Sequence, residues 1–328
     1  MICLEVEKIV DFHFDEDFLG CDDLTSNGSN LVNTVLLKFW FERGCLVYPS
    51  AYLENYKEWI EFVPVKYRER WLAALSTNLT NNMITGYQRI NDYPSLIGLK
   101  TQCEQFGVDL VLVPQCFNNL GINDDCPNIS NGFDLCKIDS FLESPSVTNS
   151  FTLSQQGIFP GDDIDLIWKR QFSKLAKHSK VITIIDRYFG VNICEDINKR
   201  KTTLEKIVSL LNDENKKYSI TIFTVGDVID SVMHTELVNY MRRFVEKPNV
   251  KKILATIKIC SCPDTVFRDH AHERFISFDN FVVTIDKGTE IFRDFPLVAT
   301  NISINRKVPD SNFSHALKHL QAKRLWSY

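Results

Sequence analysis

The chain has no apolar stretch long enough to cross a membrane, because its longest apolar runs, such as residues 110–113 and 181–185, cover only a few positions. Its first residues lack a basic segment followed by an apolar one, so we expect no secretory signal. No internal repeat or long low-complexity tract is present. These absences favour a cytoplasmic protein whose ten cysteines stay reduced.

An excess of cationic residues is also lacking. The formal net charge is −5, so the chain as a whole has no attraction for nucleic acid, and any anion-binding surface must be local. An apolar content of 44% and a charged content of 24% are typical of a globular protein with a full core. The length of 328 residues leaves room for two domains.

Turn-forming and polar residues over 143–163 mark the expected boundary, which divides the chain into domains 1–160 and 161–328. The first domain begins with a short strand-like segment, then becomes mostly helical with one clear strand. We expect an α/β domain of unknown family with a regulatory or sensing task. The second domain alternates strands and helices as βαβαβ and then adds several strands, which predicts an α/β sandwich with a mixed sheet.

The periodicity of apolar residues gives the individual elements. Predicted helices cover 31–43, 53–62, 67–79, 164–176, 230–245 and a segment opened by a Thr202–Glu205 capping box. Predicted strands cover 108–113, 181–185, 218–224, 253–259, 274–278, 281–285 and 298–304.

One segment near the C-terminus sets a histidine, a fixed cation and a carboxylate among apolar residues: His272, Arg274 and Asp279, followed by Gly288-Thr289. On a strand, His272 and Arg274 would share one face. That face suits a phosphate, since an imidazole attacks it and a guanidinium holds it. The turn at Gly288 would bring further donors to the same anion.

The pattern H-x-R-x4-D-x8-G-T resembles the H-x-K-x4-D-x6-G-S signature of the phospholipase D superfamily, with arginine replacing lysine and a longer final spacing. The resemblance covers residues of about 164–328, and the strand end Asp186-Arg187-Tyr188-Phe189 is similar to a "DxYF" end in single-repeat relatives. The most similar member is the phospholipase D-like C-terminal domain of MIT-domain proteins. The matching residues are His272, Arg274, Ile276, Phe278, Asn280, Gly288, Glu290 and Phe292.

The resemblance implies a metal-independent phosphodiesterase, with a nuclease as the main case, that needs no cofactor and forms a phosphohistidine. Members use two histidines, and one motif per chain therefore implies a homodimer. Such a fusion fits an effector of prokaryotic antiviral defence. The MIT-linked branch implies an alternative, a non-catalytic module that binds an anionic lipid head group, nucleic acid or a protein partner. A structural subunit of a larger complex is a third interpretation.

The candidate residues have different expected roles, each with a structural alternative such as a turn or a surface charge. The expected catalytic residues are His272, Arg274 and Asp279. The expected phosphate contacts are Lys287, Gly288 and Thr289. The expected supporting residues are Asp186, Arg187, His270 and Glu290.

Three further groups contain residue types that bind metals or charged partners in other proteins. The spacing of Cys260, Cys262, His270 and His272 differs from zinc-finger spacings, so we predict no metal there. The acidic group over 11–17 fits either a divalent cation or a solvated face. His315 and His319 share one helical face beside a basic tail, which fits a contact with nucleic acid or a partner, or a plain surface helix.

Overall fold

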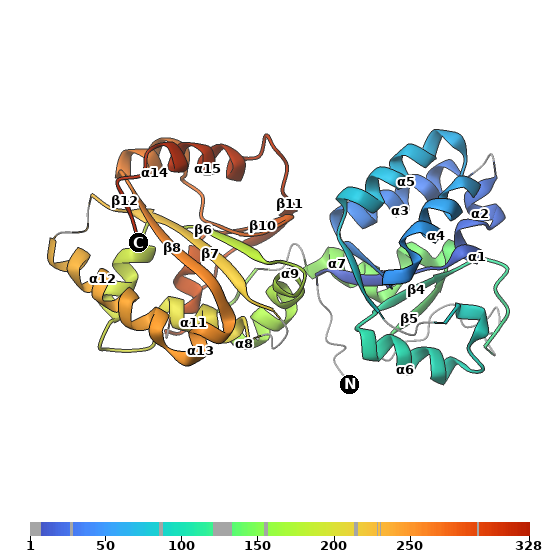
Figure 1. Cartoon of the computed structure of the whole chain (residues 1–328), viewed down its shortest axis with the longest axis horizontal. Coiled ribbons are helices and arrows are strands. Elements are labelled where there is room, and N and C mark those ends of the chain that lie inside the picture. Colours follow the sequence, from blue (N-terminus) through green and yellow to red (C-terminus); the bar gives the residue numbers. More distant parts are fainter. Residues whose placement is uncertain are drawn as a thin grey trace. The chain divides into compact units, whose positions relative to one another are not determined.

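The computed structural model describes residues 8–26, 29–84, 88–120, 133–153, 157–212, 216–227, 229, 231–293 and 295–328. The chain forms two compact units, Met1–Leu153 and Ser154–Tyr328, and the division falls inside the stretch 143–163 (Figure 1). Both units combine helices with a sheet, so the predicted α/β class is confirmed. No helix among the described residues is long and apolar enough to span a bilayer.

The first unit contains a parallel sheet with strand order β3-β2-β1-β4-β5. Its strands are β1 (Val10–His13), β2 (Gly44–Pro49), β3 (Thr80–Ile84), β4 (Leu110–Val113) and β5 (Asp134–Lys137). The sequence indicated β4 and a strand near β1 but missed the other three. Buried parallel strands lack the polar alternation that reveals a strand in sequence, and here β1, β2, β4 and β5 are buried throughout.

Helices cover both faces of this sheet. Leu110 and Leu112 face a core that contains the aromatic side chains of Phe39, Trp40 and Trp71. Val111 and Val113 face a second core beside α6. The helices are α1 (Glu16–Leu19), α2 (Asp22–Thr25), α3 (Asn30–Glu42), α4 (Leu53–Trp59), α5 (Val65–Thr77), α6 (Leu96–Phe106) and α7 (Pro145–Leu153). The three predicted helices correspond to α3, α4 and α5.

The second unit contains a mixed sheet with strand order β11-β10-β9-β6-β7-β8-β12. Strands β6 (Val181–Ile185), β7 (Tyr218–Val225) and β8 (Leu254–Cys262) run parallel to one another. The antiparallel neighbours are β9 (Phe275–Phe278), β10 (Phe281–Ile285), β11 (Ile302–Arg306) and β12 (Trp326–Ser327). Every one of these strands except β12 was predicted.

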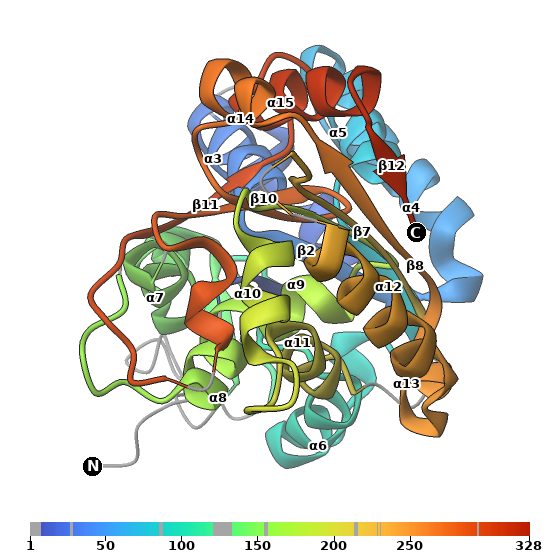
Figure 2. The same cartoon turned by 90° about the vertical axis from the view of Figure 1, so that its left-hand side faces the viewer.

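Helices of the second unit also form two layers. Helices α14 (Asp264–His270) and α15 (Asn312–Ala322) lie side by side on one face of the sheet in both views (Figures 1 and 2). The others are α8 (Ile164–Ile167), α9 (Ser173–Lys177), α10 (Phe189–Asp196), α11 (Thr203–Leu210), α12 (Ser231–Glu246) and α13 (Pro248–Ile253). A π-helical turn, Trp168–Phe172, joins α8 to α9. The predicted capping box of Thr202 and Glu205 opens α11.

Candidate functional site

The segment that contains His272 is not part of a strand. Helix α14 ends at His270, and β9 begins only at Phe275, so His272 and Arg274 lie in the short connection between them. The expectation that these two side chains share one face of a strand is therefore wrong. The backbone carbonyl of Arg274 still accepts a 3.0 Å hydrogen bond from Ile285 N, which ties the end of the connection to the end of β10.

Asp186 is the centre of a cluster at the carboxyl end of β6. The Asp186 carboxylate is 2% exposed and accepts hydrogen bonds from Thr289 N at 2.8 Å and Thr289 Oγ1 at 2.6 Å. The amide of Tyr188 donates to its other oxygen at 3.0 Å, and Arg274 Nε lies 3.8 Å from that oxygen. Since β9 is antiparallel to β6 with Ile185 opposite Phe275, Asp186 and Arg274 meet at the same edge of the sheet. The structure thus brings together Asp186, Arg274 and Thr289.

This cluster is closed to an external phosphate. Thr289 is 1% exposed, and both its amide and its hydroxyl already donate to Asp186. Arg274 also donates to the backbone carbonyl of Asp286. The buried carboxylate takes up donors that the sequence interpretation assigned to a substrate. Thr289 and Gly288 therefore hold the turn in place, whereas Lys287 and Glu290 remain exposed.

Arg187 has a positioning role beside this cluster. Its Nε lies 2.6 Å from Asp264 Oδ1, and its terminal nitrogen donates to Asp264 Oδ2 at 2.8 Å. Asp264 is the first residue of α14. The ion pair therefore fixes the start of α14 against the end of β6. It thereby positions the helix that ends at His270.

Asp279 lies at the other end of β9 from Arg274. It occupies the β9–β10 turn with φ of 35°, and its Oδ2 accepts a hydrogen bond from Lys180 N at 2.7 Å. These contacts are those of a turn residue that joins the sheet to the start of β6. The geometry separates Asp279 from Arg274 by the length of the strand, so we leave it out of the candidate site.

His272 instead opens into a pocket of about 240 Å³. The lining residues are Asp269, His270, Ala271, His272, Glu273, Phe275, Asn312 and His315. The His272 side chain is exposed, and Glu273 accepts hydrogen bonds from Asn312 Nδ2 at 3.4 and 3.5 Å. Three imidazoles and two carboxylates from α14, the connection and α15 thus line one pocket. Arg274 is not among its lining residues, so the imidazole and the guanidinium of the motif serve different places.

Nothing in the sequence indicated that His270 lies against His315 and His319. The rings of His270 and His319 stack with centroids 3.8 Å apart, and His315 lies 4.5 Å from His319. The i,i+4 spacing of His315 and His319 was visible in the sequence. The approach of α14 to α15 was not. The two cysteines of the zinc alternative, Cys260 and Cys262, are buried in β8 and take no part.

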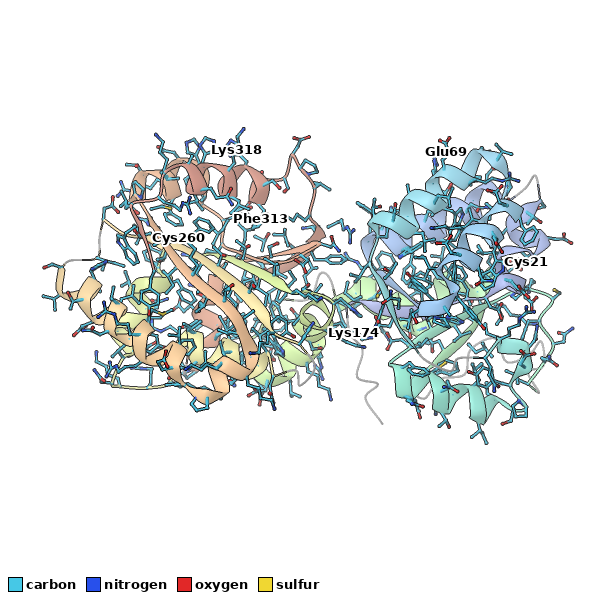
Figure 3. All side chains as sticks on the ribbon, viewed as in Figure 1. Cys21, Glu69, Lys174, Cys260, Phe313 and Lys318 are labelled. Carbon is cyan, nitrogen blue, oxygen red and sulfur yellow. The ribbon has the colours of Figure 1, made fainter. Side chains whose placement is uncertain are left out.

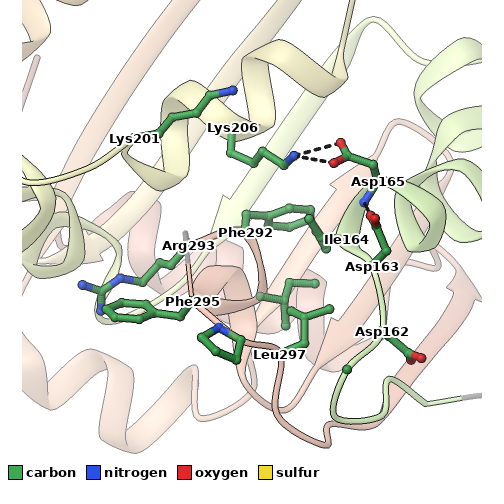
Figure 4. A pocket seen from close by; sticks show the side chains of 13 residues that line it. Asp162, Asp163, Ile164, Asp165, Lys201, Lys206, Phe292, Arg293, Phe295 and Leu297 are labelled. Carbon is green, nitrogen blue, oxygen red and sulfur yellow. Dashed lines mark hydrogen bonds and ion pairs between the residues drawn. The ribbon is translucent and has the colours of Figure 1, made fainter.

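A larger pocket of about 410 Å³ contains none of the predicted site residues (Figure 4). Two of its cations are already paired, because Lys206 Nζ lies 2.8 Å from Asp165 Oδ2 and Arg293 binds Asp196 at 2.7 Å. Arg293 also binds Glu195 at 3.0 Å. These ion pairs hold the pocket's own walls, so we do not assign the site there.

The acidic group of the first unit is partly buried rather than solvated. Asp11 is fully buried in β1, and Asp15 is 4% exposed just beyond that strand. Asp15 Oδ2 accepts a hydrogen bond from Ile90 N at 3.1 Å. Burial raises the pKa of Asp15 to about 6. Asp17 lines a separate pocket at the ends of β1 and β4, together with Asn91 and Asn119.

Neither a scan against protein-family models nor a search of curated proteins finds a match to this chain. The assignment of function therefore depends on the residues and their geometry.

Replacing Gly288 by alanine should disrupt the Asp186 cluster. Gly288 has φ of +59°, and a Cβ there would collide with Arg274 Cδ and Asp186 Oδ2. Gly161 is the matched control, since it has φ of +90° but no atom within 4 Å of its Cβ position. We expect Gly161→Ala to cost about 1–2 kcal/mol of unfolding free energy, and Gly288→Ala at least about 2 kcal/mol more. Denaturant unfolding measures both, and equal losses would contradict the cluster.

Replacing Asp15 by asparagine should stabilise the protein most at alkaline pH. Because the folded pKa is raised, the Asp15 contribution falls as the pH rises from the unfolded pKa near 4 through about 6. Asparagine keeps an acceptor for Ile90 N but does not ionise. We expect the advantage of Asp15→Asn in unfolding free energy to grow by about 1–2 kcal/mol between about pH 5 and about pH 8. A constant or shrinking advantage in urea unfolding would show that Asp15 is not held in this way.

Proposed function

We propose that the second unit cleaves phosphodiesters, nucleic acid being the expected substrate, with His272 as the nucleophile. The observation that carries this proposal is the pocket in which exposed His272 lies with His270 and His315. Imidazole is nucleophilic and titrates near neutral pH, so one such pocket can provide both an attacking group and a proton donor. The choice of phosphodiesters rests on the resemblance to the phospholipase D superfamily.

We expect the reaction to proceed in two steps that need no metal ion. An imidazole nitrogen of His272 attacks phosphorus, the bond from phosphorus to the leaving oxygen breaks, and a second pocket histidine in its protonated form gives that oxygen its proton. Water then attacks the phosphohistidine. The second histidine, now neutral, takes a proton from this water, and His272 leaves as free imidazole. His315 and His270 are the two histidines placed for this second role.

The neighbouring charges act by positioning the pocket. Asp186 fixes the turn at Thr289 and the side chain of Arg274, which follows His272 by two residues. Arg187 fixes the first residue of α14 through Asp264. Both arginines are thereby committed to carboxylates of the same chain. A substrate phosphate is then held by the histidines and by backbone of the pocket, and not by these guanidinium groups.

A second candidate function is binding of an anionic ligand without turnover, the task implied by the MIT-linked branch. The observation that favours it over turnover is that Arg274 pairs with Asp186 and does not line the His272 pocket, so this pocket lacks the fixed cation that the motif sets beside its histidine. Vesicles with anionic head groups and short nucleic acids are the ligands to test. We further propose a cytoplasmic location, which agrees with the free thiols of the cysteines that the structure describes, and a regulatory task for the first unit.

Substitution of His272 by asparagine tests the enzyme proposal. A generic chromogenic phosphodiester and single-stranded nucleic acid serve as substrates, with and without a chelator. We expect His272→Asn to lower turnover by about 10²-fold or more, because the nucleophile is lost while a polar side chain of similar shape remains. The matched control is His234→Asn, since His234 packs on Trp326 in the same unit and lies outside the pocket. Full activity of folded His272→Asn protein would exclude this mechanism.

A mixing experiment tests whether His272 works with His315 of the same chain or with His315 of a second chain. The sequence motif implied two copies, but His315 and His270 lie beside His272 in the same chain. We expect that inactive His272→Asn and His315→Asn proteins remain inactive when they are refolded together, even where light scattering shows dimers. Recovery of about a quarter of the wild-type activity would instead show that each site combines histidines of two chains.

A further inference from the structure

The second unit contains a cluster of three histidines, His270, His315 and His319. The proposed reaction uses only His270 or His315 of this cluster. His270, His315 and His319 each offer a ring nitrogen, and these nitrogens all lie within 4.8 Å of one another. The rings come from the last residue of α14 and from one face of α15. His315 and His319 are spaced i,i+4, which places two imidazoles one helical turn apart.

The two helices that carry these rings are fixed by their opposite faces. Phe267 of α14 and Phe313, Ala316 and Leu320 of α15 belong to one core cluster and are at most 1% exposed. The Sγ of Cys262 also lies 3.3 Å from the carbonyl oxygen of Leu320. Figure 3 shows Phe313 on the inner side of α15 and Lys318 on its outer side. The helix backbones thus hold the three rings together, while the exposed side chains of His270 and His315 can still adjust.

The ring nitrogens of these three histidines have no polar partner in the described part of the chain. None of the three makes a hydrogen bond or an ion pair with another described residue, although His270 and His319 stack at 3.8 Å with an interplanar angle of 12°. The nitrogens of three clustered imidazoles without protein partners are available to coordinate a metal ion.

We propose that His270, His315 and His319 bind one transition-metal ion of the zinc class. Three imidazoles are a known ligand set for zinc and leave a fourth position open for water or an anion. Tetrahedral zinc at about 2.0–2.1 Å from each nitrogen needs nitrogens roughly 3.4 Å apart. The nitrogens lie within 4.8 Å of one another here, so the stacked rings of His270 and His319 must turn toward the ion when it binds. His270 and His315 also line the His272 pocket, so the open position would face the place proposed for the substrate.

Titration with Zn²⁺ of tag-free full-length protein, after treatment with chelator, tests this site. We expect one ion per chain by calorimetry, and a visible Co²⁺ spectrum of tetrahedral intensity when cobalt replaces zinc. His315→Gln and His319→Gln should each weaken binding by at least about tenfold. His234→Gln is the matched control and should bind as wild type, because His234 packs on Trp326 away from the cluster.

Thermal melts identify any variant that fails to fold and add a second readout. Zinc should raise the melting temperature of the wild type and of His234→Gln, but raise that of folded His319→Gln much less. Absence of binding to the wild type, or equal binding to His315→Gln, His319→Gln and wild type, would overturn the proposal. Because no substrate is present, these outcomes are independent of whether His272 cleaves phosphodiesters.

Discussion

The buried carboxylate of Asp186 is the interaction on which the geometry of the second unit depends. A carboxylate away from water is costly unless donors surround it, and here two groups of Thr289, the amide of Tyr188 and the guanidinium of Arg274 do so. These contacts join the end of β6 to the turn after β10 and to the start of β9. Only glycine fits at position 288, because a side chain there would enter the space of the carboxylate.

That constraint explains why Arg274, Gly288 and Thr289, which the sequence suggested as phosphate contacts, instead surround Asp186 and hold the fold together. The motif's Arg274 pairs with Asp186, Arg187 pairs with Asp264, and the Thr289 hydroxyl is buried. The proposed chemistry therefore falls to the histidines, which gather where α14, its connection to β9 and α15 meet. His270 and His315 belong to both the pocket of His272 and the metal-ligand cluster. Metal occupancy would therefore change which histidines are free to transfer protons.

Local signals in the sequence predicted the second unit well. The apolar run of β6 and the capping box at Thr202 each specify their element through neighbouring residues alone. In the first unit β2 and β5 were missed, because strands buried on both faces do not alternate with polar residues. Their place is set by the helices that cover the sheet.

The candidate site was less predictable because its contacts are distant in sequence. Asp186 and Thr289 are 103 positions apart, and no spacing rule links them. The cluster of His270 with His319 likewise depends on the packing of α14 against α15. The opposite happened with Arg274. Its position in a motif suggested a contact with substrate, but in the fold it pairs with the carboxylate of Asp186. Residue types indicated the chemistry, and only the fold could assign the partners.

Trapping the covalent intermediate is the most direct test of whether phosphoryl transfer takes place at His272. Protein quenched under alkaline conditions during turnover of a phosphodiester, then digested and analysed by mass spectrometry, should carry a phosphoramidate adduct on His272 alone. Turnover that leaves His272 unmodified, or an adduct on another residue in its place, would contradict the account.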